Sequence, residues 1–172
     1  MNKKIAVAAA LVILPLAALS QSAWAQAAKT PFTALERLES EKTVRHVTGK
    51  DLGDTLKNSM KPGDFYAQIL LSKHDGYQII NTIRDKDGQA EVHADWNDNL
   101  FVQEGEANFV TGGTPVDGKT TAPGETRGTA VKGGKTMTMC AGDYFFVPAG
   151  TTHQMLVPAG KRIKFIAFKT HK

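Results

Sequence analysis

Residues 142–153 read GDYFFVPAGTTH. The stretch contains a glycine turn, a short apolar run, a proline and a second glycine turn, and a histidine follows directly. Turn chemistry accounts for the glycines and the proline, because these residues supply the backbone angles that tight turns need. Turn chemistry does not require a histidine, so His153 is a candidate functional residue: its imidazole is both titratable and able to bind a metal.

Short apolar runs and turn signals alternate on both sides of this stretch. The runs are rich in Val, Ile, Thr and aromatic residues, and Asp-Gly, Glu-Gly-Glu, Gly-Gly and Ala-Gly turns separate them. Many short strands at close spacing are typical of an all-β sandwich or barrel rather than of βαβ units. We expect strands at 65–72, 77–83, 90–94, 100–104, 106–111, 136–140, 144–149, 153–157 and 162–168.

The first 25 residues have the features of a secretory signal peptide. Basic residues precede an apolar run from Ile5 to Leu19, and Ala23-Trp24-Ala25 supplies a small-residue cleavage site. The apolar run is shorter than the roughly 20 residues that span a bilayer, which argues against a retained membrane anchor. We therefore expect cleavage before Gln26 and an exported protein, periplasmic or secreted, with no membrane contact after cleavage.

The size and charge of the remaining chain restrict its class. The mature chain is the size of one domain and is able to bury a full core. The whole sequence has 21 basic and 17 acidic side chains, and two of the basic ones lie in the signal segment, so the mature charges nearly balance. No basic run with interleaved aromatic residues occurs, so we expect no nucleic acid as a partner.

The segment between the signal and the first predicted strand is polar and helical in pattern. Thr33 and Glu36 have the spacing of a capping box, and Thr48 is placed to cap a second short helix that carries Leu56. Pro62-Gly63 then ends the helical character. The expected domains are a signal peptide (1–25), an N-terminal helical extension (26–63) and a β-barrel domain (64–172).

The chain contains one cysteine, Cys140, so no disulfide within the chain can form. Cys140 follows Met137 and Met139 in a strand-like run. We expect a small buried hydrophobic side chain here rather than a reactive thiol.

The spacing within residues 142–153 resembles the second signature motif of the cupin superfamily. That motif reads Gly-x5-Pro-x-Gly-x2-His, and Gly142, Pro148, Gly150 and His153 occupy its four positions. The resemblance implies an all-β fold of the cupin type, a double-stranded β-helix or jelly-roll barrel, here with short N-terminal helices. It also implies that His153 is a metal ligand that points into the barrel.

The stretch EVHADWNDNLFVQEG, which ends at Gly105, resembles the first cupin motif with two substitutions. The cupin pattern reads His-x-His-x4-Glu-x6-Gly, and this stretch reads Glu-x-His-x4-Asp-x6-Gly. Glu91 stands where the first histidine belongs, and Asp98 stands where the glutamate belongs. By resemblance the metal ligands are Glu91, His93, Asp98 and His153.

This spacing has a mechanical reason. Side chains alternate between the faces of a strand, so Glu91 and His93, two residues apart, point to the same side. Asp98 lies on the next strand, after a turn, and His153 lies on a strand that is distant in sequence. If these strands are neighbours in the barrel, the four donors can meet at one ion. Two imidazole nitrogens and two carboxylate oxygens suit a divalent transition metal such as manganese, iron, zinc or nickel. The two anionic ligands would leave the site formally neutral and lower its Lewis acidity.

Several alternatives stay open at this point. Aspartate is one methylene shorter than glutamate, so Asp98 either reaches the ion directly or does so through a water molecule. If Glu91 and Asp98 instead form surface salt bridges, His93 and His153 are isolated residues in a metal-free cupin. Asp95, also two residues from His93, is a reserve ligand.

The segment 114–132 is rich in Gly, Thr and Pro, and we expect a long loop there. A loop of this length inside a compact domain is usually functional or mobile, and this one would close over a substrate. It carries Glu125 and Arg127, and a guanidinium is suited to binding a carboxylate. The alternative is a surface loop whose charged side chains simply face water. Trp96, beside the predicted site, is a third candidate substrate contact at the barrel mouth.

The expected function is that of an exported, single-domain cupin that binds a divalent transition metal. The resemblance allows a small-molecule metalloenzyme of the oxygenase, isomerase or lyase type, and the fold does not choose among these reactions. The alternative is a metal-free cupin that binds or senses a small molecule without catalysis. Proteins that resemble this barrel commonly pair through their outer sheets, which implies a homodimer.

Overall fold

The computed structural model describes residues 46–172. The predicted signal peptide (1–25) and the predicted helix after Thr33 lie outside the described residues. Within residues 46–172, no helix is long and apolar enough to cross a membrane.

Each run predicted to be extended contains a strand, and four further short strands follow Gly113. Strand ends differ from the predicted ones by a few residues, because pairing partners decide where a strand stops. The strands are β1 (Tyr66–His74), β2 (Tyr77–Arg84), β3 (Ala90–His93), β4 (Trp96–Thr111), β5 (Thr114–Val116), β6 (Lys119–Ala122), β7 (Glu125–Gly128), β8 (Ala130–Lys132), β9 (Lys135–Cys140), β10 (Tyr144–Val147), β11 (His153–Leu156) and β12 (Ile163–His171).

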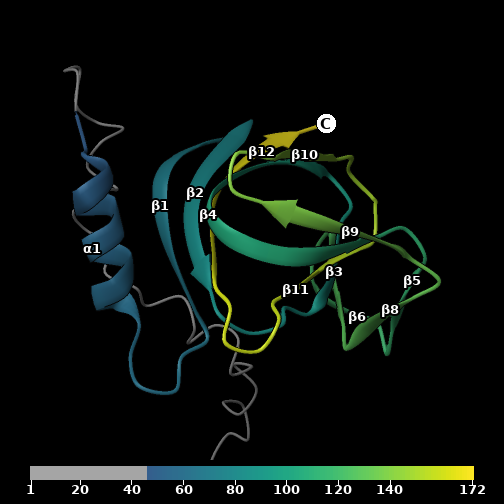
Figure 1. Ribbon diagram of the computed structural model, residues 1–172. Helices are drawn as coiled ribbons and strands as arrows, with labels where there is room; N and C mark the ends of the chain where they lie inside the picture. The colour runs from purple at the N-terminus through teal and green to yellow at the C-terminus, as the bar shows by residue number, and fades with distance from the viewer. Residues whose placement is uncertain (1–45) are drawn as a thin grey trace, which may run out of the picture.

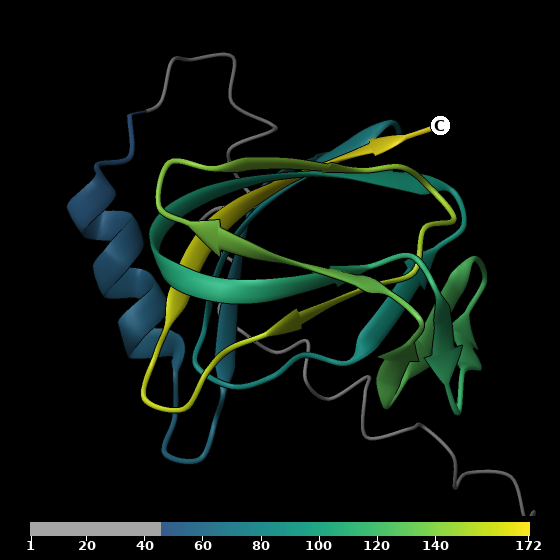
Figure 2. The same cartoon turned by 45° about the vertical axis from the view of Figure 1, so that its right-hand side comes forward.

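Ten of these strands form one curled antiparallel sheet (Figures 1 and 2). Its order is β1-β2-β12-β4-β11-β3-β7-β6, and β9 and β10 also pair with β4. Strand β4 therefore has four partners and connects the two halves of the barrel. The remaining pair, β5 and β8, forms a separate two-stranded sheet.

Strand β4 is one continuous strand of 16 residues, whereas the sequence predicted two strands separated at Gly105. The residues before Gly105 pair with β10 and β12, and those after it pair with β9 and β11. Gly105 has a φ of 78°, and a Cβ atom there would lie 1.8 Å from the carbonyl oxygen of Arg162. The glycine therefore lets the strand pass from one half of the barrel to the other without a turn.

The barrel core is built by alternate residues of the strands. On β10, Phe145 packs against this core while Phe146 is exposed, as the period of two predicted. The buried members of the core are Leu100, Val102, Ala107, Phe109, Met139, Val147, Met155, Val157, Ile163, Phe165 and Ala167.

Helix α1 (Gly49–Ser59) confirms the helix predicted after Thr48. The Thr48 side chain accepts a hydrogen bond from the backbone N–H of Asp51, which satisfies one of the free donors of the first turn. Leu56 is fully buried and packs in a second cluster with Ile69 and Ile83. The helix thus lies beside β1 and β2 and covers the outside of the barrel (Figure 1).

The segment 114–132 is not the long loop that the sequence predicted, because it contains β5, β6, β7 and β8. Strand β7 pairs along the whole of β3 and with β6, so these two strands extend the barrel sheet, while β5 and β8 form the separate two-stranded sheet. At Gly128 a Cβ atom would lie 2.5 Å from the carbonyl oxygen of Val116. This glycine permits the close approach of the two backbone segments.

The prediction of a buried Cys140 is wrong, since the residue is exposed. Its neighbour Met139 is fully buried in the barrel core. Because adjacent strand residues point to opposite faces, the inward position of Met139 places the Cys140 thiol on the outside.

Gly105→Ala should destabilise the protein by about 3 kcal/mol, since it combines a left-handed backbone angle with a clash against the backbone of Arg162. Gly142→Ala is the matched control: its φ is also positive, but no atom lies within 4 Å of the added Cβ, so about 1 kcal/mol is expected. Urea unfolding of both variants measures the difference. Equal losses would contradict the role given to Gly105.

Candidate metal centre

Three strands bring the four predicted ligands together. Glu91 and His93 project from β3, Asp98 lies near the start of β4, and His153 begins β11. Strands β3 and β11 pair so that His153 lies opposite Glu91. The convergence follows from this register, because neighbouring strands present directly opposed residues on the same face.

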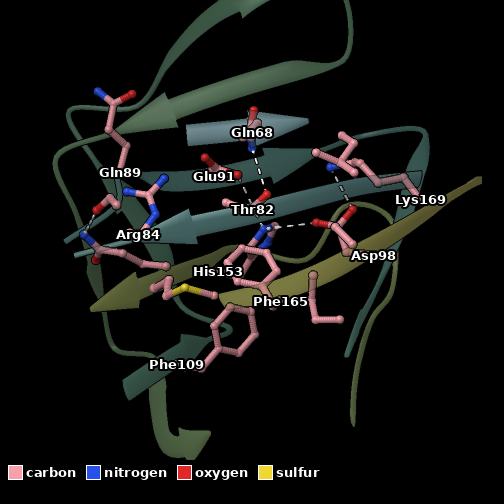
Figure 3. A pocket seen from close by; sticks show the side chains of 16 residues that line it. Gln68, Thr82, Arg84, Gln89, Glu91, Asp98, Phe109, His153, Phe165 and Lys169 are labelled. Atoms are coloured by element: carbon pink, nitrogen blue, oxygen red, sulfur yellow. Dashed lines mark hydrogen bonds and ion pairs between the residues drawn. The ribbon is translucent and has the colours of Figure 1, made fainter. Parts of the chain in front are cut away.

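The distances within the cluster fit the spacing of ligands around one ion. Oε2 of Glu91 lies 3.3 Å from Nε2 of His93 and 3.8 Å from Nε2 of His153. Oδ2 of Asp98 lies 3.5 Å from Nε2 of His153 (Figure 3) and 3.5 Å from Nε2 of His93. Two tetrahedral ligands with bonds of about 2.1 Å are separated by about 3.4 Å, so these contacts match a shared cation.

The other ring nitrogen of each histidine is held by the protein. Nδ1 of His93 lies 2.7 Å from Oε2 of Glu125, and Nδ1 of His153 lies 3.0 Å from the carbonyl oxygen of Thr151. Since both partners are acceptors, each Nδ1 carries the proton and donates it. The Nε2 lone pairs are thereby left for a metal, as in carboxylate–histidine–metal triads.

Nε2 of His93 is buried and makes no hydrogen bond within residues 46–172. Its nearest polar neighbours are the carboxylate oxygens of Glu91 and Asp98. A buried lone pair that faces two anionic oxygens is unfavourable unless a proton or a cation lies between them. This atom therefore indicates that a proton or a metal cation lies at the centre of the cluster.

The histidines differ in their pKa values. Burial lowers the pKa of His153, so its ring is neutral at pH 7 and ready to act as a ligand. Burial also opposes the charging of His93, but the hydrogen bond to Glu125 and the nearby carboxylates of Glu91 and Asp98 outweigh it and raise the pKa of His93. Burial acts against ionisation of Glu91, yet His93 and Arg127 together lower its pKa. A proton and a metal therefore compete for His93.

Two cations lie behind the carboxylates. Nζ of Lys169 lies 2.7 Å from Oδ1 of Asp98. The guanidinium of Arg127 lies 2.9 Å from Glu125 and 3.7 Å from Oε1 of Glu91. Each ligand carboxylate thus turns one oxygen to the centre and the other to a cation. These cations offset the negative charge of the ligands. They would therefore partly reverse the loss of Lewis acidity that two carboxylate ligands cause in a bound metal.

Lys169 is the main residue of the site that the sequence analysis missed. It continues the inward series Phe165 and Ala167 on β12 and lies opposite Asp98 in the sheet. Extending the predicted strand past residue 168 would have identified it from the period of two. The carbonyl of Thr151 gives no signal in the sequence, since every residue carries one.

Two cavities open beside the cluster. A small one of about 100 Å³ reaches His153 and Asp98, and a larger one of about 590 Å³ reaches His93 and Glu125. Glu91 lines both cavities, and Figure 3 shows it in the wall of the smaller one. The larger volume is within the range of small-molecule sites.

The remaining candidates fall into two groups. Trp96, Glu125 and Arg127 line the larger cavity, although Glu125 and Arg127 also have partners in the protein. Asp95, the reserve ligand, instead pairs with Lys172 at 3.2 Å and is half exposed. The histidines outside the two motifs are also exposed, namely His46, His74 and His171.

No protein-family model and no curated protein matches the sequence. Solved structures do match the fold, among them a double-stranded β-helix protein from Klebsiella pneumoniae (TM-score 0.53, 12% identity, 74% of this chain and 90% of that one). Another is the polyketide cyclase RemF from Streptomyces resistomycificus (TM-score 0.50, 17% identity, 74% of this chain and 80% of that one). A third is a conserved protein of unknown function from Streptococcus pyogenes (TM-score 0.51, 13% identity, 75% of this chain and 91% of that one).

These likenesses establish the fold, since all three identities are low. The chain is a double-stranded β-helix protein with its donor cluster inside the barrel. This fold is the one that the resemblance of the two motifs to cupins implied, so the predicted fold class is confirmed.

Glu125→Gln should weaken binding of Zn²⁺ by about 10- to 100-fold, because the amide no longer supplies a charged acceptor for His93 Nδ1. Competition with a chromogenic chelator measures the affinity. Glu106→Gln, which removes an exposed carboxylate paired with Lys161, is the matched control and should leave it unchanged. Equal affinities of the unmutated protein and both variants for Zn²⁺ would contradict a role for Glu125 in metal binding.

Proposed function

We propose that the protein holds a divalent transition metal through Glu91, His93, Asp98 and His153 and presents it to a small organic molecule. The observation that carries this proposal is the anchoring of both Nδ1 atoms, which directs two Nε2 lone pairs toward two carboxylate oxygens. The ligand atoms of Glu91, His93 and His153 all lie within 4.8 Å of one another. The carboxylate of Asp98 is not part of this group, although its Oδ2 lies 3.5 Å from Nε2 of each histidine.

The donor set supports the choice of metal. Two imidazole nitrogens with carboxylate oxygens suit manganese, iron, zinc or nickel, whereas a soft metal would favour thiolates. The single thiol of the chain, Cys140, is exposed on the outside of the barrel. Bound at this point, the metal would supply Lewis-acid or redox chemistry to a molecule in the adjoining cavity.

A small-molecule metalloenzyme of the oxygenase, isomerase or lyase type is the function we propose for this site. The larger cavity supports it, because it borders His93 and leaves space for a substrate next to the cluster. One structural neighbour, RemF, is a polyketide cyclase, so proteins of this fold include enzymes. The reaction depends on the residues around the metal rather than on the fold.

A metal-free binding or sensing protein is the second candidate, and one observation favours it. Lys169 and Arg127 pair with Asp98, Glu125 and Glu91, so the carboxylates already have positive partners within the chain. In this case a proton on His93 would take the place of the cation, in line with the raised pKa of that ring.

Metal analysis separates the two candidates. The protein purified without chelators should contain about one equivalent of a transition metal, and His93→Ala or His153→Ala should abolish it. At a free metal concentration 100-fold above Kd, binding should stabilise the fold by about 2.7 kcal/mol, measured by thermal unfolding with and without chelator. The exposed His74→Ala is the control and should keep the metal. Metal-free protein with unchanged unfolding in both histidine variants would favour the second candidate.

We also propose that the protein acts outside the cytoplasm, on the basis of the signal-like sequence of residues 1–25. Expression of the full chain in a bacterium with a working secretory pathway should yield a mature protein that begins at Gln26. Intact mass and N-terminal sequencing measure this, and Ala23→Arg together with Ala25→Arg should block the cleavage. Recovery of the uncleaved chain from the cytoplasm of the unmutated strain would contradict export.

A further inference from the structure

Arg84 is a charged residue of the barrel wall that the sequence analysis did not identify. It ends β2 and continues the inward series Ile80 and Thr82. Its side chain lines both cavities, together with Glu91 and Lys169 (Figure 3). A guanidinium is therefore placed in the space that adjoins the proposed metal centre.

The guanidinium of Arg84 is held in place by rings and by a close backbone approach. Its Cζ atom lies 5.1 Å from the ring centroid of Tyr66 and 5.9 Å from that of Phe65. A Cβ atom on Gly88 would lie 3.1 Å from Nη1 and 3.3 Å from Cζ, so a larger residue there would displace the side chain. Packing against aromatic faces orients a guanidinium without neutralising it.

Arg84 differs from the other cations of the cavity in having no carboxylate at ion-pair distance within the described part of the chain. Arg127 pairs with Glu125, and Lys169 pairs with Asp98. Nη1 of Arg84 is buried and finds no acceptor among the described residues. Burial lowers the pKa of Arg84, and the more distant carboxylate of Glu91 offsets this only in part. A guanidinium with a buried N–H group that lacks an acceptor is costly unless an anion completes the site.

The charges around the cavity also indicate an anionic occupant. The carboxylates of Glu91, Asp98 and Glu125 are matched in number by three cations, Arg84 included. A bound divalent metal would leave about two positive charges in excess, since neutral histidines add none. A molecule with two negative charges would neutralise this excess.

We propose that the cavity binds a small organic dicarboxylate, with one carboxylate at the metal and the other on the guanidinium of Arg84. This inference rests on the proposed metal centre for the first of these contacts. The amide and hydroxyl groups of Gln68, Thr82 and Gln89, which line the smaller cavity, would hydrogen-bond the bound molecule. Arg84 thereby selects an anionic substrate, while the metal and its ligands act on it.

The test uses the Zn²⁺-loaded protein and straight-chain dicarboxylates of three to five carbons, titrated by calorimetry: malonate, succinate and glutarate. At least one of them should bind tenfold or more tightly than the neutral succinamide. Arg84→Gln should weaken that binding at least tenfold with the Zn²⁺ stoichiometry unchanged, and Arg84→Lys should retain part of it. Arg162→Gln is the matched control, because Arg162 is exposed and pairs with Asp85.

The outcomes separate this inference from the proposed function. Zn²⁺ binding without any preference for the dicarboxylates over succinamide, or equal binding by Arg84→Gln and the unmutated protein, would overturn the inference and leave the metal centre intact. Dicarboxylate binding that depends on Arg84 but is the same without Zn²⁺ would support the anion site and contradict the proposed contact between the bound molecule and the metal. Failure of the protein to bind Zn²⁺ would contradict the metal centre itself. If Arg84→Gln does not fold, the affinities of Arg84→Lys for succinate and for succinamide are measured instead. Weaker binding of succinate than in the unmutated protein, with a remaining preference over succinamide, would support the inference, and an unchanged affinity for succinate would contradict it.

Discussion

Two buried imidazole nitrogens face two carboxylate oxygens, and this arrangement requires a positive charge between them. The ring orientation that produces it is not free to relax, because Glu125 and the carbonyl of Thr151 hold the opposite nitrogen of each ring. Turning either ring would break a hydrogen bond that is itself largely buried, at a cost of about 1–3 kcal/mol. The protein thus maintains, through its hydrogen bonds, a cluster of like partial charges that a cation would stabilise.

The cations behind the carboxylates determine how such a centre would behave. Lys169 and Arg127 bind the oxygens that face away from the histidines, which fixes the direction in which Asp98 and Glu91 present the other oxygen. They also draw electron density from the ligands, so a metal here would be a stronger Lewis acid than the ligand list suggests. With Arg84 unpaired in the same cavity, the electrostatics favour an anionic molecule rather than a neutral one.

The barrel places this chemistry on short strands whose positions depend on a few close approaches. At Gly105, β4 changes partners, which brings Asp98 on one half of the strand within reach of residues on the other half of the barrel. Strand β7 supplies Glu125 and Arg127 by pairing with β3, so the wall of the cavity and the support of His93 come from one edge of the sheet. Rigid strands hold such groups more accurately than a loop would.

The double-stranded β-helix fold and the four candidate ligands could be predicted from the sequence because two motifs resemble those of cupins, and the opposite orientations of Phe145 and Phe146 follow from the two-residue period of a strand. Which side chains contact the far side of the candidate ligands depends on the tertiary structure. Glu125 is 32 residues from His93 in sequence, and Lys169 meets Asp98 through the register of β12 against β4. The course of the chain through Gly105, the strands within 114–132 and the outward thiol of Cys140 were likewise decided there. Such features depend on which strands pair and in which register, and a local sequence pattern does not contain that information.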